Sequence, residues 1–168
     1  MITHDELLRL LHYDPLTGVF TRLVGTSGRF GKIGNSVGGL SERGYIRINI
    51  SGHKYMAHTL AWFYTHKEWA KEIDHKNRVR HDNRLCNIRP VTRSQNKFNS
   101  LPYKNNSSGF RGVTFRKERG DWQAYASINH QRFHLGFFST PEAAARAYDE
   151  KVRGEVGAYA VFNFENDV

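Results

Sequence analysis

One short stretch of the chain holds three side chains that could bind a metal ion or move a proton: Asp74, His75 and Asn96. An imidazole can take a proton from water near neutral pH. A carboxylate and an amide oxygen are suitable ligands for Mg²⁺, which keeps several waters and uses few protein groups. Together these groups could hydrolyse a phosphodiester, a reaction that needs an activated water and a means of holding charge on the leaving oxygen.

The residues around this set are mostly basic. Between Lys76 and Lys104 there are eight Lys or Arg residues and one acid, Asp82. The whole chain of 168 residues has 25 Lys and Arg against 16 Asp and Glu, a net charge of +9. This charge favours a polyanionic partner, and charge alone also allows an anionic membrane.

Other features of the composition exclude several classes of protein. No apolar run approaches the ~20 residues that a membrane span needs. No signal-like segment follows Met1, and the single cysteine excludes an internal disulfide and a cysteine-rich zinc site. We therefore expect a cytoplasmic protein that binds nucleic acid and no membrane.

The stretch from residue 73 to 99 predicts a strand, a polar loop, a second strand and a helix. Thr92 and Gln95 form a capping-box pattern that opens the helix at about Arg93. Asp74 and His75 would end the first strand, and Asn96 would lie on the helix. Because neighbours in a strand point to opposite faces, Asp74 and His75 can serve one site only if the chain bends there.

Three spaced segments together resemble the HNH nuclease motif of the ββα-metal or His-Me finger fold, closest to phage and intron-encoded homing endonucleases: IDH at 73–75, DNRLCNIRPVT at 82–92 and QNKFN at 95–99. The resemblance implies that His75 is the general base. It implies that Asn87 braces the loop and orients His75, and that Asp74 and Asn96 hold a divalent metal ion. Mg²⁺ is the expected ion, with Mn²⁺ as the alternative. The competing interpretation makes His75 a structural side chain and Asn96 a solvent-facing one.

Residues 1–72 predict the elements that precede this motif. Thr3 and Glu6 form a capping-box pattern that opens a helix reaching Leu11. His58 is expected to be a packed, hydrogen-bonded side chain, with a catalytic role as the alternative. The other expected elements are a turn at 14–18, a strand at 19–23, a glycine-rich loop at 25–44, a hairpin at 44–56 that turns at 51–52, and a buried helix at 58–66.

A Pro-, Asn- and Ser-rich linker at 100–109 separates this half from a second pattern. Three strand-like runs are expected at 109–115, 122–129 and 131–138. A helix begins with Pro141 at its first position and is expected to end at Gly154. Residues 160–164 predict a terminal apolar strand or extension.

Four phrases of this second half resemble the ethylene-response-factor (Apetala-type) DNA-binding domain: GFRGVTFRK, WQAYASI, HLGFFSTPEAAARAYDE and AVFNF. That family lays a three-stranded antiparallel sheet in the major groove of double-stranded DNA. The resemblance implies DNA contacts from five residues, of which the first two are the best candidates for guanine or phosphate: Arg111, Arg116, Ser127, Arg132 and His134. The alternative is a solvated sheet face.

The sequence therefore predicts an α+β protein. A ββα-metal nuclease domain at 1–104 would precede a three-stranded sheet packed on one helix at 105–168. We expect a metal-dependent DNA endonuclease of the homing type that nicks one strand per site, as a monomer or a dimer. The alternatives are a DNA-binding regulator with an inactive nuclease fold and an RNA-directed nuclease. Removing residues 105–168 is expected to weaken DNA binding and site choice more than intrinsic cleavage.

Overall fold

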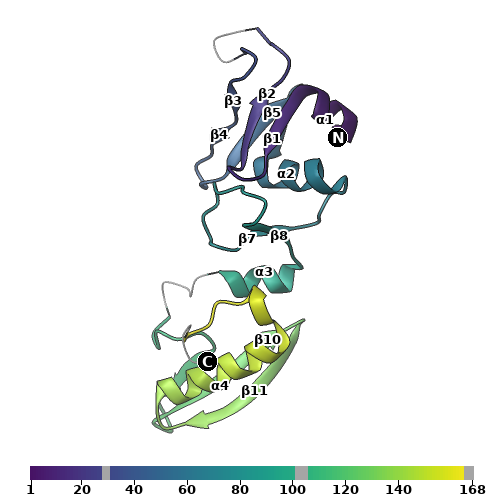
Figure 1. The fold of residues 1–168 in the computed structure, drawn as a ribbon. Helices are drawn as coiled ribbons and strands as arrows, with labels where there is room; N and C mark the ends of the chain where they lie inside the picture. Colours follow the sequence, from purple (N-terminus) through teal and green to yellow (C-terminus); the bar gives the residue numbers. More distant parts are fainter. Residues whose placement is uncertain (28–30, 101–105, 165–168) are drawn as a thin grey trace. The chain divides into compact units, whose positions relative to one another are not determined.

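The computed structural model describes residues 1–27, 31–100 and 106–164. Within these residues the protein is a mixed α and β structure with four α-helices and several small antiparallel sheets (Figure 1). This agrees with the expected mixed class. The chain forms two compact units, Met1–Val91 and Thr92–Val168. The predicted boundary after residue 104 lies within residues 101–105, which are outside the described ranges, and it stays a prediction.

In its described residues, the first unit contains two helices and three small sheets with the orders β1-β2-β3, β4-β5-β6 and β7-β8. Its elements, in order, are α1 (His4–Leu10), β1 (Leu11–Asp14), β2 (Val19–Arg22), β3 (Ser36–Val37), β4 (Gly39–Leu40), β5 (Ile46–Ile50), β6 (His53–Met56), α2 (Ala57–His66), β7 (Ile73–His75) and β8 (Ile88–Pro90).

The N-terminal helix begins where the sequence predicted, with the Thr3 side chain accepting a hydrogen bond from the Glu6 N–H. Its predicted end at Leu11 is wrong, because Leu11 opens the strand β1. Leu11 and Tyr13 are buried while His12 between them is exposed. Burying these two side chains requires the period of a strand, and β1 pairs with β2 in an antiparallel ladder.

The core of the first unit forms between α2 and the strands. Ile48 and Ile50 of β5 are buried while Arg47 and Asn49 are exposed, as the alternating pattern predicted. The predicted hairpin and buried helix are both confirmed by β5, β6 and α2. Leu60 of α2 is fully buried in the same cluster.

The second unit begins with a short helix and continues into a sheet backed by a longer helix. Its elements are α3 (Arg93–Asn99), β9 (Val113–Arg116), β10 (Asp121–Ile128), β11 (Gln131–Phe138), α4 (Pro141–Glu155) and the 3-10 turn η1 (Gly157–Tyr159). The sheet is antiparallel with the order β11-β10-β9, and α4 lies across one of its faces (Figure 1). The predicted three-stranded sheet on one helix is present.

One local prediction in this unit needs correction, and another is narrowed to one of its two alternatives. The α4 helix continues through Glu155, so Gly154 lies inside its last turn. Residues 160–164 extend along the unit without forming a strand. Asp149 of α4 explains the extended path, because its carboxylate accepts hydrogen bonds from the backbone N–H groups of Asn163 and Phe164. Those N–H groups are therefore satisfied by a side chain and need no strand partner.

Among the described residues, no helix has the length and apolar character required to cross a membrane.

Candidate active site and nucleic-acid interface

Two motif residues of the first unit, Asp74 and His75, lie on the small β7-β8 ladder. Asp74 pairs with Arg89 and His75 pairs with Ile88 in antiparallel register. Asp74 and His75 are both buried, at 8% and 4% exposure. The strand ends at His75, whose carbonyl accepts a hydrogen bond from the Arg78 N–H at 2.9 Å. The chain thus turns directly after this pair of residues.

The His75 ring has a defined hydrogen-bond partner in Asn83. Its Nε2 lies 3.3 Å from the Asn83 Oδ1. The Asn83 Nδ2 donates to the carbonyl of His81 at 3.2 Å, which fixes the amide so that its oxygen faces the ring. An amide oxygen can only accept, so Nε2 carries the proton and Nδ1 is the nitrogen without one. This tautomer is the one needed for Nδ1 to act as a base.

Two other rings pack on His75. The His58 ring meets it edge-on, with centroids 4.9 Å apart, and the Tyr45 ring lies 6.0 Å away. Burial lowers the pKa of His75, against the raising effects of Asn83 and the nearby acids. Burial, with a smaller contribution from His75, lowers the pKa of His58 to about 4. Both imidazoles are therefore neutral at neutral pH.

The N-terminal hairpin supports Asn83. The Tyr13 hydroxyl donates to the Asn83 carbonyl at 2.7 Å, and the Leu85 N–H donates to the Pro15 carbonyl at 3.0 Å. Gly18, at φ +74°, lies so close that a Cβ there would be 2.5 Å from the backbone of Asn83. The turn before β2 therefore requires glycine, and it holds the partner of His75 in place.

Asn87 connects the two sides of the loop between β7 and β8. Its Oδ1 accepts from the Asn77 N–H at 3.0 Å, and its Nδ2 donates to the Asp82 carbonyl at 2.7 Å. Hydrogen bonding from Arg84 lowers the pKa of Asp82 to about 2, which keeps this loop carboxylate charged. The geometry matches loop bracing, whereas the residue placed against the His75 ring is Asn83. Asn83 lies in the 82–92 segment of the HNH resemblance, which implied no role for it.

Asp74 is held by a residue that the sequence analysis did not single out. The Nε and Nη2 of Arg89 both donate to the Asp74 Oδ2, at 3.1 and 2.9 Å. Both side chains are largely buried, so the guanidinium compensates a carboxylate that would be costly to bury alone. The signal that could have revealed Arg89 was the antiparallel pairing of its strand with the strand of Asp74.

Asn96 is half-buried on α3, which belongs to the second unit. Its relation to Asp74 therefore stays a prediction. The described residues contain no group of three or more His, Cys, Asp or Glu suited to a metal ion. Mg²⁺ does not need such a group, because it is commonly held by one or two carboxylates, waters and substrate phosphates. The Asp74 carboxylate and the Asn96 amide fit this ion by donor type.

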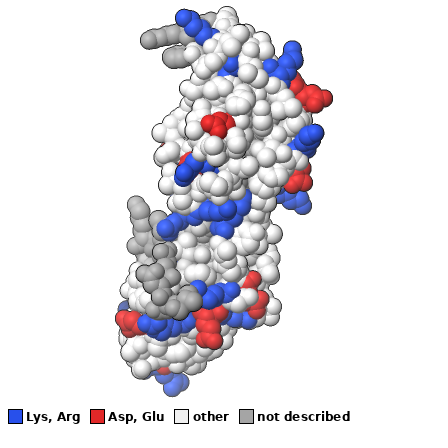
Figure 2. Space-filling view, in the orientation of Figure 1, with Lys and Arg blue, Asp and Glu red and all other residues white. Residues whose placement is uncertain are grey.

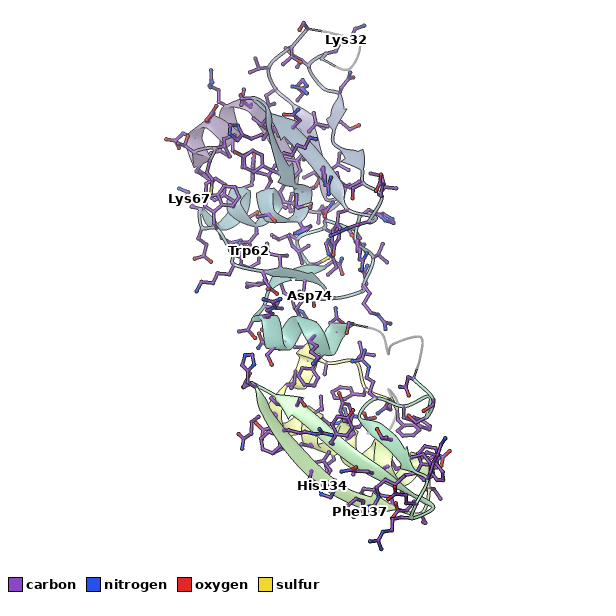
Figure 3. The ribbon with its side chains drawn as sticks, turned by 180° about the vertical axis from the view of Figure 1, so that it is seen from behind. Lys32, Trp62, Lys67, Asp74, His134 and Phe137 are labelled. Atoms are coloured by element: carbon purple, nitrogen blue, oxygen red, sulfur yellow. The ribbon has the colours of Figure 1, made fainter. Side chains whose placement is uncertain are left out.

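The second unit presents one face of its sheet away from α4. Ala124, Ala126 and Ile128 of β10 are buried, and the residues between them point to the opposite side. Directly paired residues of an antiparallel sheet share a face. The register therefore places four of the expected DNA-contacting residues on the open face: Arg116, Ser127, Arg132 and His134. Figure 3 labels His134 and Phe137 on β11.

The two arginines on the open face are held by neighbouring side chains. Arg116 donates to both carboxylate oxygens of Asp121, at 2.7 and 2.6 Å, and lies 3.5 Å from the centroid of the Phe137 ring. The guanidinium lowers the pKa of Asp121 through this hydrogen bond. Arg132 lies 4.1 Å from the centroid of the Tyr125 ring. These contacts restrict the guanidinium groups before any ligand binds.

Arg111, the fifth expected residue, precedes β9 and has a different setting. Its Nη1 donates to the Phe98 carbonyl at 3.0 Å. It lines a cavity of about 350 Å³ together with Tyr125 and Ser127 of the open face. Figure 2 shows basic side chains on both units, with acidic side chains among them.

Comparison with known proteins finds two resemblances. Residues 55–98 match a family described as HNH endonuclease. The chain is 28% identical over 126 residues to the AP2-like ethylene-responsive transcription factor AIL7 of Arabidopsis thaliana, a match covering 74% of this chain and 24% of that protein. It is 39% identical over 61 residues to APETALA2-like protein 2 of Oryza sativa subsp. japonica, covering 36% of this chain and 14% of that protein. The chain thus spans a quarter or less of these relatives, and both resemblances indicated by the motifs are confirmed.

Proposed function

We propose that this chain is a metal-dependent HNH endonuclease that hydrolyses phosphodiester bonds in double-stranded DNA. The observation that carries the proposal is the state of His75. Its neutral, buried ring is held through Nε2 by Asn83, inside the segment that matches the HNH endonuclease family. With the proton on Nε2, Nδ1 is the nitrogen that would take a proton from the attacking water.

Asp74 and Asn96 are the residues that would hold the divalent ion, Mg²⁺ or Mn²⁺. Such an ion would neutralise charge on the scissile phosphate and on the leaving oxygen. Arg89 fixes the Asp74 carboxylate, and Asn87 braces the loop beside it. Four side chains of the first unit would therefore serve distinct tasks, with His75 moving the proton.

The second unit would position the cut. A sheet can enter the major groove of B-form DNA, whereas the major groove of A-form RNA is deep and narrow. The open face carries Arg116, Ser127, Arg132 and His134, and the chain is similar to plant proteins named as transcription factors. We propose DNA binding by this face. A homing enzyme of phage type fits the combination, and one such site cuts one strand, so a double-strand break needs two sites.

A second candidate is a DNA-binding regulator whose nuclease fold is inactive. One observation favours it: the Asp74 carboxylate already accepts two hydrogen bonds from Arg89. A metal ion would have to share that carboxylate with a guanidinium. This candidate predicts salt-sensitive DNA binding without metal-dependent cleavage.

Nicking of supercoiled plasmid decides between the two. We expect the parent protein to nick the plasmid in the presence of Mg²⁺ and to lose this activity in excess chelator. His75→Ala should nick at least ~10²-fold more slowly, because it lacks the general base. His12→Ala is the matched control, since His12 is exposed on β1. Equal nicking by the parent and His75→Ala would remove the role assigned to His75, and no nicking by the parent would favour the regulator.

A further inference from the structure

The helix that carries Asn96 is built into the unit that we propose to bind DNA. Phe98 of α3 is 6% exposed and packs in one cluster with residues of β10 and α4: Ala126, Ile128, Tyr148 and Val152. Near the start of the helix, the Ser94 hydroxyl accepts a hydrogen bond from the Asn129 N–H at 3.2 Å. Both ends of α3 are therefore attached to the β-sheet unit, on either side of Asn96.

The C-terminal turn of α3 depends on two donors from distant parts of this unit. The Phe98 carbonyl accepts hydrogen bonds from the Val161 N–H at 3.1 Å and from the Arg111 Nη1 at 3.0 Å. The last carbonyls of a helix have no partner within the helix. Arg111 thus satisfies a helix carbonyl two residues from Asn96.

The other two nitrogens of the Arg111 guanidinium indicate that this site binds a ligand. Its Nε and Nη2 are buried without a hydrogen-bond partner of good geometry among the described residues, and the Tyr148 hydroxyl is the neighbour that interacts with the guanidinium. The side chain lines the cavity of about 350 Å³, whose wall also includes Lys97 of α3 and Ser127 of the sheet. Buried donors without partners are costly. Two parallel N–H groups of a guanidinium match two oxygens of a phosphate, and Lys97 adds positive charge.

We infer that Arg111 is a positioning residue that couples binding of a DNA backbone phosphate to the placement of α3. The guanidinium is planar and rigid, so a phosphate on Nε and Nη2 fixes the direction of Nη1 toward the Phe98 carbonyl. DNA bound to the second unit would then steady the helix that carries Asn96. The inference rests on the proposed function, in which Asn96 serves the metal ion.

If cutting and binding were separable modules, removing residues 105–168 would weaken DNA binding more than intrinsic cleavage. The proposed coupling predicts a different result. Removing residues 105–168 would remove Arg111, Val161 and most of the cluster around Phe98. Intrinsic cleavage should then slow and the Mg²⁺ requirement should rise, in addition to the weakening of DNA binding. A point variant tests the idea more sharply than a truncation, because the rest of the unit remains.

The test compares Arg111→Gln with Arg119→Gln in the full chain. Arg119 is exposed on the turn between β9 and β10, so its replacement removes the same charge without touching α3. Hydrogen–deuterium exchange of the α3 amides is followed with and without a saturating mixed-sequence DNA duplex, in chelator so that nothing is cut. The Mg²⁺ concentration for half-maximal plasmid nicking is measured in parallel.

We expect DNA to slow α3 exchange in the parent and in Arg119→Gln, and to leave it unchanged in Arg111→Gln. The Mg²⁺ requirement of Arg111→Gln should rise about tenfold, the scale of one charge-assisted hydrogen bond, while that of Arg119→Gln stays at the parent value. Thermal melts establish folding. If Arg111→Gln does not fold, Ser94→Ala replaces it, and it should raise the Mg²⁺ requirement severalfold by loosening the start of α3.

The coupling would be overturned if DNA slowed α3 exchange equally in Arg111→Gln and in the parent. If Ser94→Ala has to be used, an α3 exchange and a Mg²⁺ requirement equal to those of the parent would overturn it. Absence of nicking by the parent would instead refute the proposed nuclease activity. The exchange measurement does not depend on cleavage, so it decides the coupling in either case.

Discussion

Replacing Asn83 by alanine should damage catalysis although Asn83 never touches the substrate in the proposed reaction. The side chain is 2% exposed, and its Oδ1 is the acceptor placed 3.3 Å from the His75 Nε2. Alanine removes this acceptor and also the Nδ2 that donates to the His81 carbonyl. The backbone carbonyl of residue 83 keeps its hydrogen bond from the Tyr13 hydroxyl, so the loop should remain in place.

The size of the effect follows from the buried N–H of His75. A buried donor left without its partner costs about 1–3 kcal/mol. The ring can avoid this cost by moving its proton to Nδ1 or by rotating, and either change removes the base from its working position. Each 1.36 kcal/mol corresponds to tenfold in rate. We therefore expect single-turnover nicking by Asn83→Ala to be about 10- to 100-fold slower at unchanged DNA affinity.

The variant Asn83→Asp separates tautomer control from simple packing. A carboxylate still accepts from Nε2–H, and its charge favours the protonated ring, so the pKa of His75 should rise. In the parent, burial lowers this pKa from 6.5, and the acid limb of the nicking rate should lie below pH 6.5. In Asn83→Asp the limb should move to higher pH, with a rate above that of Asn83→Ala on the alkaline side.

Single-turnover rates across pH, with DNA affinities measured in chelator, provide the assay. Asn49→Ala is the matched control, because Asn49 is exposed on β5. A rate and pH profile for Asn83→Ala equal to those of the parent would refute the assignment of the base to Nδ1. So would an Asn83→Asp variant that behaves like Asn83→Ala.

Two further predictions concern stability. Below pH 6.5 the unfolded chain protonates His58, whereas the folded chain resists until about pH 4. As the pH is lowered below 6.5, the free energy of unfolding should therefore decrease by about 1.4 kcal/mol per pH unit, to a total loss of about 3 kcal/mol. Urea titrations should show a shallower dependence for His58→Gln, and an equal slope would contradict the assignment. Arg89→Ala leaves the buried Asp74 carboxylate without its cation and should destabilise the protein by about 3 kcal/mol. Urea titrations should find Arg89→Ala/Asp74→Ala more stable than Arg89→Ala alone; a double variant of equal or lower stability would oppose this explanation.

Local patterns were sufficient to predict several elements of this protein. The capping box of Thr92 and Gln95 predicted α3 with its observed bounds, and both reciprocal hydrogen bonds are present. The alternation of Ile46, Ile48 and Ile50 predicted the hairpin and its buried face. These features depend on residues a few positions apart, so their physics is contained in the sequence. The end of α1 was harder to predict, because Leu11 suits a helix face and a strand face equally.

Only the tertiary structure could identify the partners of the motif residues. The loop and the N-terminal hairpin that contacts it place Asn83 against His75. The strand register places Arg89 opposite Asp74. The membership of α3 in the second unit depends on Phe98 finding a cluster formed by residues 126–152. Residue types and short spacing therefore determined which chemistry could be proposed for the chain. Contacts between residues far apart in sequence decided which groups hold the reacting ones in place, because such contacts leave no periodic pattern in the chain.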